Sequence, residues 1–353
     1  GANALAGLIN IVSNDPTEDF YSEISGSISE FGGKDFGIII SNSNENNFGY
    51  RLGFKNSKSD GFVKNVFLNR NDTNDIDETI SRAKFTKNND TTKLTLNIFY
   101  ADIDNGYDAF SLDNNRNTYS DEPGYDRQKT TAASTIFEKT LRNNNTIEIL
   151  ASFSDSELGY AYDEDWSNTG ICEKTPCDST LFGFDWWYSS FDSFNRDNTN
   201  HSIDLRYISN SENVNWVVGL YNRDQDINLI RKYTYLQNDF KSSFDTRNSA
   251  IYGQFTNNFT NKIKFQAGLR YEDRRADYLD NNGPVPEGFV CIEVYPRPDS
   301  CLFDNNYSKS ENFWGGQISL QNQITENTMI YVLLSRGYKP GGVNIDGQIS
   351  QQN

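Results

Sequence analysis

Apolar and polar residues alternate along several stretches of the chain. In "IKFQAGLRY" (263–271), every odd position is apolar and the even positions are Lys, Gln, Gly and Arg. A period of two places successive side chains on opposite faces of a strand. The same alternation occurs in "HSIDLRYI" (201–208), "KLTLNIFY" (93–100) and "TIEILASF" (146–153). These stretches predict β-strands with one apolar face and one polar face.

The links between the predicted strands alternate in length. Between residues 20 and 338 the pattern predicts about thirteen strands, each of about 9–14 residues, a length that suits a tilted strand crossing a bilayer. Short turns are predicted at 41–47, 87–90, 142–145, 209–213, 257–262 and 323–327. After a tight first link at "FGGKD", the other links are long, at 57–75, 103–127, 157–196, 226–246 and 276–308. Short links on one edge and long links on the other are typical of an up-and-down outer-membrane barrel, whereas alternation alone also fits a soluble sandwich.

The composition supports a β-rich protein with a wet interior. Aromatic residues make up 14% of the chain, but apolar residues make up only 36%, below the roughly 45–50% of an average globular protein. Charged residues such as Asp204, Arg206, Arg223 and Arg270 alternate away from the apolar face, as expected if they face a water-filled lumen. Aromatic residues near strand ends predict interfacial girdles at Phe99, Tyr100, Phe153, Tyr207, Tyr221, Tyr271 and Tyr331.

The charge and the hydropathy exclude two classes of protein. A net charge of −17 leaves no basic patch for phosphates, which argues against a nucleic-acid partner. The longest apolar runs, "LAGLINIV" and "FGIII", fall far short of the ~20 residues that a spanning helix needs, which excludes a helical membrane protein.

Four cysteines form two close pairs in the long links, Cys172 with Cys177 and Cys291 with Cys301. Their spacing is not Cys-x-x-Cys, and the single histidine, His201, lies far away in sequence. Two local disulfides are therefore favoured over a thiolate metal site. Disulfides in turn imply an oxidising compartment such as the periplasm or the cell surface.

The link at 157–196 carries the candidate binding residues. Trp166, Trp186, Trp187 and Tyr188 are a large aromatic load for a loop, and they either recognise a bulky ligand or pack together as a small loop core. The acidic run "YDEDW" (162–166) could bind Ca²⁺ or act as a carboxylate pair, although a solvated loop is the favoured interpretation. No catalytic set, phosphate-binding loop or histidine-based metal cluster is present in the sequence, so neither an enzyme nor a cofactor is expected.

Four segments, in order, resemble the TonB-dependent outer-membrane receptors. "GANALAGLINIVSNDP" (1–16) resembles the last segment of the plug domain, and "FGYRLGFKNSKSDGFVKN" (48–65) is similar to an early barrel strand and its loop. "YGQFTNNFTNKIKFQAGLRYEDR" (252–274) is similar to a mid-barrel hairpin, and "SRGYKPGGVN" (335–344) resembles a strand-end motif of siderophore-type members. The resemblance implies an antiparallel transmembrane β-barrel with long extracellular loops and short periplasmic turns.

The resemblance also implies a domain division and a partial barrel. Residues 1–16 would be the C-terminal end of the plug, and residues 17–353 would be about the first thirteen strands of a 22-stranded barrel. The chain is therefore expected to be a fragment of a longer receptor. Its first stretch is not expected to be a signal peptide, because it lacks a basic region and its apolar run is interrupted by Gly7 and Asn10.

The function that the resemblance implies is TonB-energised uptake of a bulky, scarce ligand, a ferric siderophore, across the outer membrane of a Gram-negative bacterium. The implied partners are outer-membrane lipid and the TonB energy-transducing complex. The TonB complex would be reached through the N-terminal part of the receptor. Three alternatives remain at this point: the same family with cobalamin, a glycan or a metal chelate as cargo, a plain porin or adhesin barrel, and a secreted β-rich glycan-binding protein.

Overall fold

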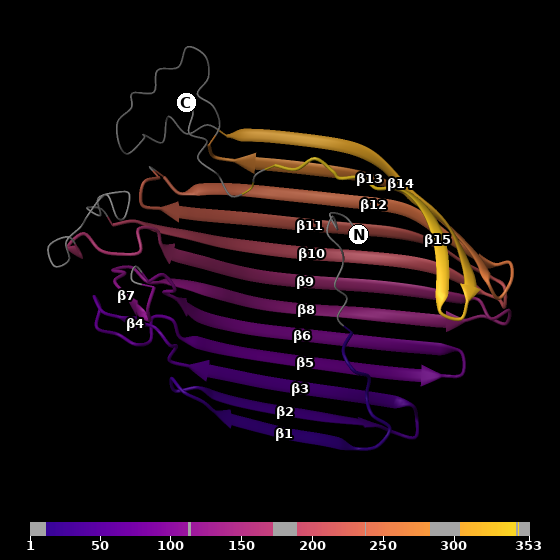
Figure 1. The fold of residues 1–353 in the computed structure, drawn as a ribbon, viewed down its shortest axis with the longest axis horizontal. Coiled ribbons are helices and arrows are strands. Elements are labelled where there is room, and N and C mark those ends of the chain that lie inside the picture. The colour runs from indigo at the N-terminus through magenta and orange to yellow at the C-terminus, as the bar shows by residue number, and fades with distance from the viewer. Residues whose placement is uncertain are drawn as a thin grey trace, which may run out of the picture.

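The computed structural model describes residues 12–111, 114–171, 189–236, 238–282, 304–343 and 345. In this part of the chain, thirteen antiparallel strands form one sheet in which each strand pairs with the next one along the chain (Figure 1). They are β1 (Tyr21–Ile28), β2 (Lys34–Ser43), β3 (Phe48–Ser59), β5 (Ile76–Asn89), β6 (Thr92–Tyr107), β8 (Gly124–Thr140), β9 (Thr146–Asp163), β10 (Phe191–Asn210), β11 (Val214–Tyr233), β12 (Phe240–Asn258), β13 (Ile263–Asp280), β14 (Asn305–Thr325) and β15 (Thr328–Arg336). The predicted up-and-down antiparallel architecture is confirmed.

Two short strands, β4 (Lys64–Asn65) and β7 (Asn117–Thr118), form a separate parallel pair between two of the long links. Within the described residues, no helix is long and apolar enough to cross a membrane.

The links at the two ends of the strands differ in length, as the sequence predicts. Short turns join β2 to β3, β5 to β6, β8 to β9, β10 to β11, β12 to β13 and β14 to β15. The longest links all leave the opposite end of the strands, on the left in Figure 1. They are the two links that contain β4 and β7, the link between β9 and β10, and the link between β13 and β14.

Many strands are longer than the predicted 9–14 residues. β10 and β11 each have 20 residues and β14 has 21, and the predicted long link at 226–246 shrinks to 234–239. The apolar alternation stops where a strand passes out of the apolar layer, but the backbone pairing continues beyond that point. Hydrophobic periodicity therefore detects only the part of each strand that faces an apolar medium.

The apolar sets of the strands lie on the outer, convex face of the sheet. The register places one row of apolar side chains directly opposite one another across five strands, and each is 41–53% exposed: Leu205, Leu220, Ile251, Tyr271 and Trp314. A closed soluble core would bury these residues, whereas a lipid-facing wall exposes them. The geometry contradicts the soluble-sandwich alternative.

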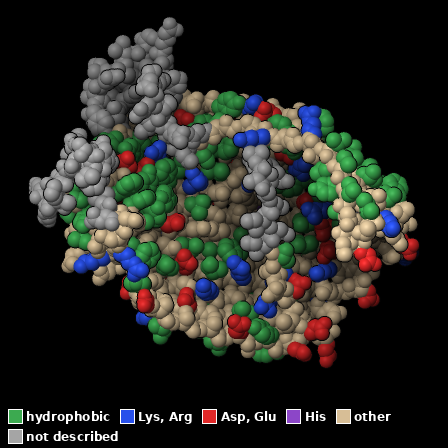
Figure 2. Space-filling view, in the orientation of Figure 1, with side chains coloured by type: hydrophobic (Ala, Val, Ile, Leu, Met, Phe, Trp, Pro, Cys, Tyr) green, Lys and Arg blue, Asp and Glu red, His purple; other side chains and the backbone are tan. Residues whose placement is uncertain are grey.

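The inner, concave face is polar. The sheet curls so that β14 and β15 come over its front in Figure 1, and the face seen in Figure 2 is hollowed and carries acidic and basic side chains. Among the buried residues, polar and charged side chains outnumber apolar ones. The low apolar content of the sequence thus has a structural cause: the described strands form a polar inner wall in place of an apolar core.

Two of the predicted girdle residues face the other way. Phe99 lies under the guanidinium of Arg82, and Tyr221 lies 5.1 Å from the guanidinium of Arg270, both on the concave face. Strand ends favour aromatic residues on either face, so sequence position alone does not separate a girdle residue from a lumen residue. Tyr271, by contrast, is on the exposed apolar face.

Candidate functional site

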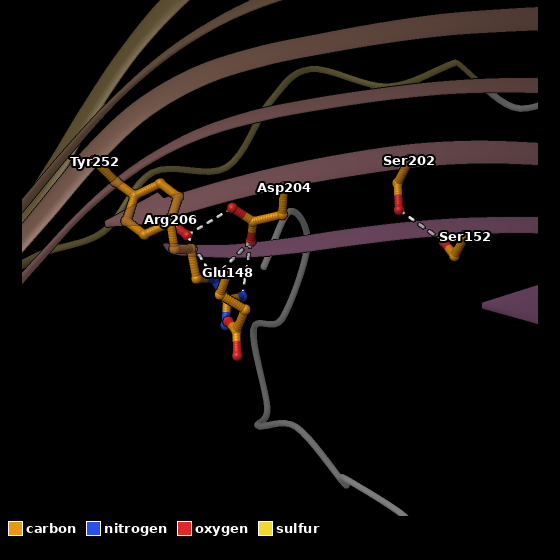
Figure 3. Close-up of polar contacts among 6 residues, drawn as sticks. All are labelled: Glu148, Ser152, Ser202, Asp204, Arg206 and Tyr252. Atoms are coloured by element: carbon orange, nitrogen blue, oxygen red, sulfur yellow. Dashed lines mark hydrogen bonds and ion pairs between the residues drawn. The ribbon is translucent and has the colours of Figure 1, made fainter. Parts of the chain in front are cut away.

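Arg206 is the centre of a polar network on the concave face. Its Nη1 lies 2.9 Å from Glu148 Oε1, its Nη2 lies 2.7 Å from Asp204 Oδ2, and its Nε donates to the Tyr252 hydroxyl at 2.9 Å. The Tyr252 hydroxyl in turn donates to Asp204 Oδ1 at 2.7 Å. Figure 3 shows these four side chains converging from β9, β10 and β12. Charge-assisted hydrogen bonds of this kind fix the side chains in one arrangement.

A glycine makes this network possible. Tyr252 on β12 reaches Arg206 on β10 by lying across the intervening strand β11 at Gly219, which pairs with both residues. A Cβ on Gly219 would lie 2.3 Å from the Tyr252 ring. Four residues from the Glu148–Arg206 pair, Ser152 on β9 and Ser202 on β10 bond to each other at 2.7 Å (Figure 3).

A second network lies beside the first. Glu272 on β13 is fully buried and accepts hydrogen bonds from Asn248 and from Tyr338, each at 2.8 Å. Its Oε2 also lies 2.7 Å from Arg270 Nη2, and the Arg270 guanidinium lies 5.7 Å from the centre of the Tyr252 ring. The two networks thus share a face and are joined through Arg270 and Tyr252.

The segment after β15 packs against this inner wall. Tyr338 stacks on Phe313 with ring centres 5.1 Å apart, and Arg274 donates to the Gly341 carbonyl at 3.1 Å. Further along, Ser242 donates to the Ile345 carbonyl at 2.8 Å. Residues 337–343 of the stretch "SRGYKPGGVN", singled out from the sequence, therefore lie over the concave face of β12–β14.

The segment before β1 also contacts the inner wall. Lys84 on β5 is buried and donates to the Ser13 carbonyl at 2.8 Å and to Asp15 Oδ1 at 2.6 Å. Thr17 adds a backbone hydrogen bond to Ser41 Oγ on β2 at 2.9 Å. The expected plug end, as far as the structure describes it, thus approaches the strands from the lumen side.

An aromatic groove opens at the end of the strands from which the long links leave. Trp166 stacks on Phe110, with ring centres 4.6 Å apart and planes 14° apart. The groove has a volume of about 660 Å³, and its walls also include Tyr160, Tyr162, Phe194, Arg127 and Arg196. The groove faces the lumen side of the wall, because four of its residues are on the same face of their strands as Glu148 and Asp204: Tyr160, Tyr162, Phe194 and Arg196. We call this feature the mouth groove.

The backbone at Trp166 is held in an uncommon conformation. Its φ is +59°, in the left-handed region that aromatic residues seldom occupy, and its N–H donates to Asp163 Oδ1 at 2.9 Å. Such outliers persist only where surrounding contacts fix them, and they concentrate at functional sites. The acidic run 162–166 therefore sets the position of the Trp166 indole.

The acidic run is not the solvated loop that the sequence favoured. Asp163 is 6% exposed and Asp165 is 2% exposed, because the segments 118–121 and 189–190 cover them. Burial raises the pKa of Asp163 to about 8, and the nearby Asp165 and Asp121 carboxylates add to the shift. The sequence cannot show this burial, since both covering segments are distant in the chain.

Of the residues predicted to bind ligand, Trp166 is described and lies in the mouth groove, 39% exposed. Trp186, Trp187 and Tyr188 lie outside the described residues, as do Cys172, Cys177, Cys291 and Cys301. Sequence reasoning did not single out Phe110, Phe194 and Arg196 for the groove, or Glu148 and Tyr252 for the network. The only signal for them is strand phase, which shows which residues share the polar face but not which ones meet.

The comparisons with known proteins agree with this geometry. Residues 42–353 match the family model for the TonB dependent receptor-like β-barrel. No curated protein has a matching sequence.

Solved structures with a similar fold include siderophore and ferric-complex receptors. The ferric yersiniabactin uptake receptor FyuA from Yersinia pestis superimposes with a TM-score of 0.77 at 16% identity, over 98% of this chain and 51% of that one. The siderophore receptor PiuA from Acinetobacter baumannii gives 0.69 at 14% identity, over 94% and 51%. The open form of the ferric-catecholate import receptor Fiu from E. coli K12 gives 0.67 at 14% identity, over 93% and 56%.

The chain thus spans about half the length of these structures, and at such identities they show a shared fold alone. The family-model match extends from β2 to the last residue, and the thirteen antiparallel strands have an apolar outer face and a polar inner face. On this evidence, the chain belongs to the TonB-dependent receptor-like β-barrel family.

Proposed function

We propose that this chain forms part of the wall of an outer-membrane receptor of a Gram-negative bacterium, which takes up a ferric siderophore with energy supplied through TonB. The observation that carries the proposal is the mouth groove, where Trp166 and Phe110 stack at the entrance to a polar lumen. Flat aromatic faces and the Arg196 guanidinium suit a bulky, ring-bearing ligand.

The inner wall supports passage of a polar ligand. Arg206 and Arg270 are satisfied by hydrogen bonds within the wall, so they line a path without leaving uncompensated charge at its surface. A hydrated ligand that moves along such a wall keeps water or hydrogen-bond partners throughout, which an apolar channel would deny it.

We assign residues 1–16 to the end of a plug domain and residues 17–353 to the barrel. The contacts of Ser13 and Asp15 with Lys84 support this division, because they tie the segment to the lumen side of the strands. In the complete receptor the TonB complex would act through the N-terminal part, and the ligand would meet the mouth groove first. Trp186, Trp187 and Tyr188 remain predicted ligand-binding residues, and the two disulfides remain predictions.

The names of the structural neighbours favour a ferric siderophore over cobalamin, a glycan or another metal chelate as the cargo. The test is growth of an iron-starved host lacking its own siderophore receptors, with the full-length protein expressed and one iron source supplied at a time. We expect growth on at least one ferric siderophore and none without the protein. Absence of growth on every ferric siderophore supplied, with the protein present in the outer membrane, would overturn the assignment of cargo.

A further inference from the structure

Three segments that are distant in the chain meet at the end of the strands from which the long links leave. The Asp121 N–H donates to the Ser167 carbonyl at 3.0 Å, and the Glu164 N–H donates to the Ser190 carbonyl at 2.9 Å. These bonds join the three segments into one packed unit, which we call the loop junction: residues 118–122, 163–168 and 189–190.

The loop junction holds the two stacked rings of the mouth groove. On one side, the Trp166 N–H donates to Asp163 Oδ1 at 2.9 Å. On the other side, the buried Asp108 carboxyl accepts from the Thr118 hydroxyl at 2.8 Å, and Phe110 follows two residues later in the chain. A change within the loop junction therefore reaches both rings.

Two buried carboxyl groups of the loop junction contact each other. Asp163 is 6% exposed and Asp165 is 2% exposed, and their carboxyl groups lie within hydrogen-bonding reach of one another. The Ser120 hydroxyl also reaches the Asp163 carboxyl, and Asp165 Oδ1 accepts from the Ser190 N–H at 2.8 Å. An ionised carboxylate only accepts hydrogen bonds, so a bond between the two carboxyl groups requires that one of them holds a proton.

The charged groups that face this carboxyl pair are acidic. Asp121 and Glu122 belong to the covering segment 118–122, and burial raises the pKa of Glu122 as well. Glu164 lies between the two members of the pair in sequence, and the third segment, 189–190, consists of two serines. Within the described residues, neither member of the pair forms an ion pair with Lys or Arg.

A shared proton accounts for the pair better than a cation does. Arg231 lies two strands away on β11 and is bound to Asp192 at 2.7 Å. No group of three or more His, Cys, Asp or Glu side chains in the described part of the chain is arranged to hold a metal. Two adjacent buried carboxylates cannot both ionise without a large cost, so one stays protonated. Burial raises the pKa of Asp163 to about 8, which makes Asp163 the donor and Asp165 the acceptor.

We propose that Asp163 and Asp165 share one proton and form a latch that positions the Trp166 indole in the mouth groove. In the closed loop junction, Asp163 donates this proton to Asp165 and accepts the Trp166 N–H at its Oδ1. When the junction opens, both carboxyl groups meet water and release the proton, because their pKa returns to about 4. Asp163 is thus a positioning residue for Trp166 and does not itself bind the ligand.

The latch weakens as the pH rises. The closed junction holds its proton up to about pH 8, whereas the open junction loses it near about pH 4. The closed form is therefore favoured at low pH, and this advantage is lost by about tenfold per pH unit until it levels off above about pH 8. Under the proposed function, on which this last step rests, the mouth groove should hold its ligand more tightly at about pH 6 than at about pH 8.5.

The test is amide hydrogen exchange of the full-length protein in detergent across this pH range, with each rate divided by the intrinsic rate of an unstructured chain. We expect protection at residues 163–168 to fall about tenfold per pH unit up to about pH 8 and then to level off. Asp163→Asn with Asp165→Asn keeps both oxygen acceptors but removes the shared proton, so protection should not change with pH. This readout needs no ligand and is independent of the proposed function.

Two further variants separate the pair from other acids. Glu157→Gln, at an exposed position of β9, is the matched control and should leave the exchange profile unchanged. Glu122→Gln should keep the slope, because the shared proton remains; loss of the slope in this variant would overturn the proposal and assign the proton to Glu122. If the double variant does not fold, the wild-type profile still decides, since protection that is flat up to about pH 8 would overturn the latch.

Titration with the ferric siderophore that supports growth tests the consequence for binding. The wild-type affinity should decrease from about pH 6 to about pH 8.5, and the affinity of the double variant should change less. A sloped exchange profile in a protein that binds no ferric siderophore at any pH would support the latch and would contradict the proposed function instead.

Discussion

At the scale of single residues, the inner wall depends on side chains that reach across strands. Arg206 bonds Glu148 on one neighbouring strand and Tyr252 two strands away on the other side. The second contact exists because Gly219 leaves room beneath the Tyr252 ring. The glycine is thus a component of the polar network, although it forms no side-chain contact itself.

Gly219→Val should displace the Tyr252 ring and break its hydrogen bonds to Arg206 and Asp204. Loss of hydrogen bonds to charged groups predicts a decrease of about 1–3 kcal/mol in the free energy of unfolding. Denaturant unfolding in detergent measures it. Gly53→Val is the control, since a Cβ on Gly53 meets nothing within 4 Å. Equal losses in the two variants would show that the Tyr252 contact is not responsible.

Trp166→Ala should weaken binding of the ferric siderophore that supports growth, because the aromatic wall of the mouth groove loses its stacked partner on Phe110. Truncation of a central aromatic residue predicts a decrease in affinity of about tenfold or more, and Trp166→Phe should retain most of the affinity. Fluorescence or calorimetric titration measures both. Trp314→Ala, on the convex face, should bind normally; a similar loss there would refute a specific role for Trp166.

At the scale of the strand, the two faces require different side chains. Leu269 belongs to the apolar set of β13 and is 60% exposed on the convex face, whereas Gln266 belongs to the opposite, lumen-facing set. The same substitution should therefore have opposite consequences at two positions three residues apart.

Leu269→Arg should destabilise the folded barrel by about 2–4 kcal/mol, because it places a charge against hydrocarbon. Gln266→Arg should change the stability much less, because its side chain meets water in the lumen. Refolding of the full-length protein into lipid vesicles, followed by denaturant titration, measures both values. A larger loss for Gln266→Arg than for Leu269→Arg would mean that the faces are assigned the wrong way round.

The segment before β1 is fastened to β5 mainly through Lys84, which is buried, and the same ammonium group contacts Ser13 and Asp15. Lys84→Met should release this segment and increase amide hydrogen exchange at residues 12–16. Lys87→Met is the matched control, since Lys87 is exposed and bonds a turn carbonyl at Asn46. Unchanged exchange in Lys84→Met would show that other contacts hold the segment.

The sequence predicts strands and faces better than it predicts contacts. The alternation at 263–271 places Leu269 and Tyr271 outside correctly, because the period of two follows directly from strand geometry. It cannot predict that Tyr252 meets Arg206, since that contact depends on the register of three strands. The burial of Asp165 is likewise hidden, because its cover comes from Ser190, which lies 25 residues away.

At the scale of the whole molecule, the described strands form an open sheet whose edges are β1 and β15. The outer face of the sheet is apolar, the inner face is polar, and the long links gather at one end of the strands, together with the mouth groove. Under the proposed function, this arrangement would separate ligand capture at that end of the strands from passage along the wall. It also explains why an acidic, apolar-poor chain can form a membrane wall.

The most direct test of the central claim is uptake of radiolabelled iron, as the ferric siderophore that supports growth, by iron-starved cells that express the full-length protein. Matched cells with and without TonB are compared. The proposed function predicts uptake only when both the protein and TonB are present, with a strong decrease in Trp166→Ala. Equal uptake without TonB would contradict it and would indicate a passive pore.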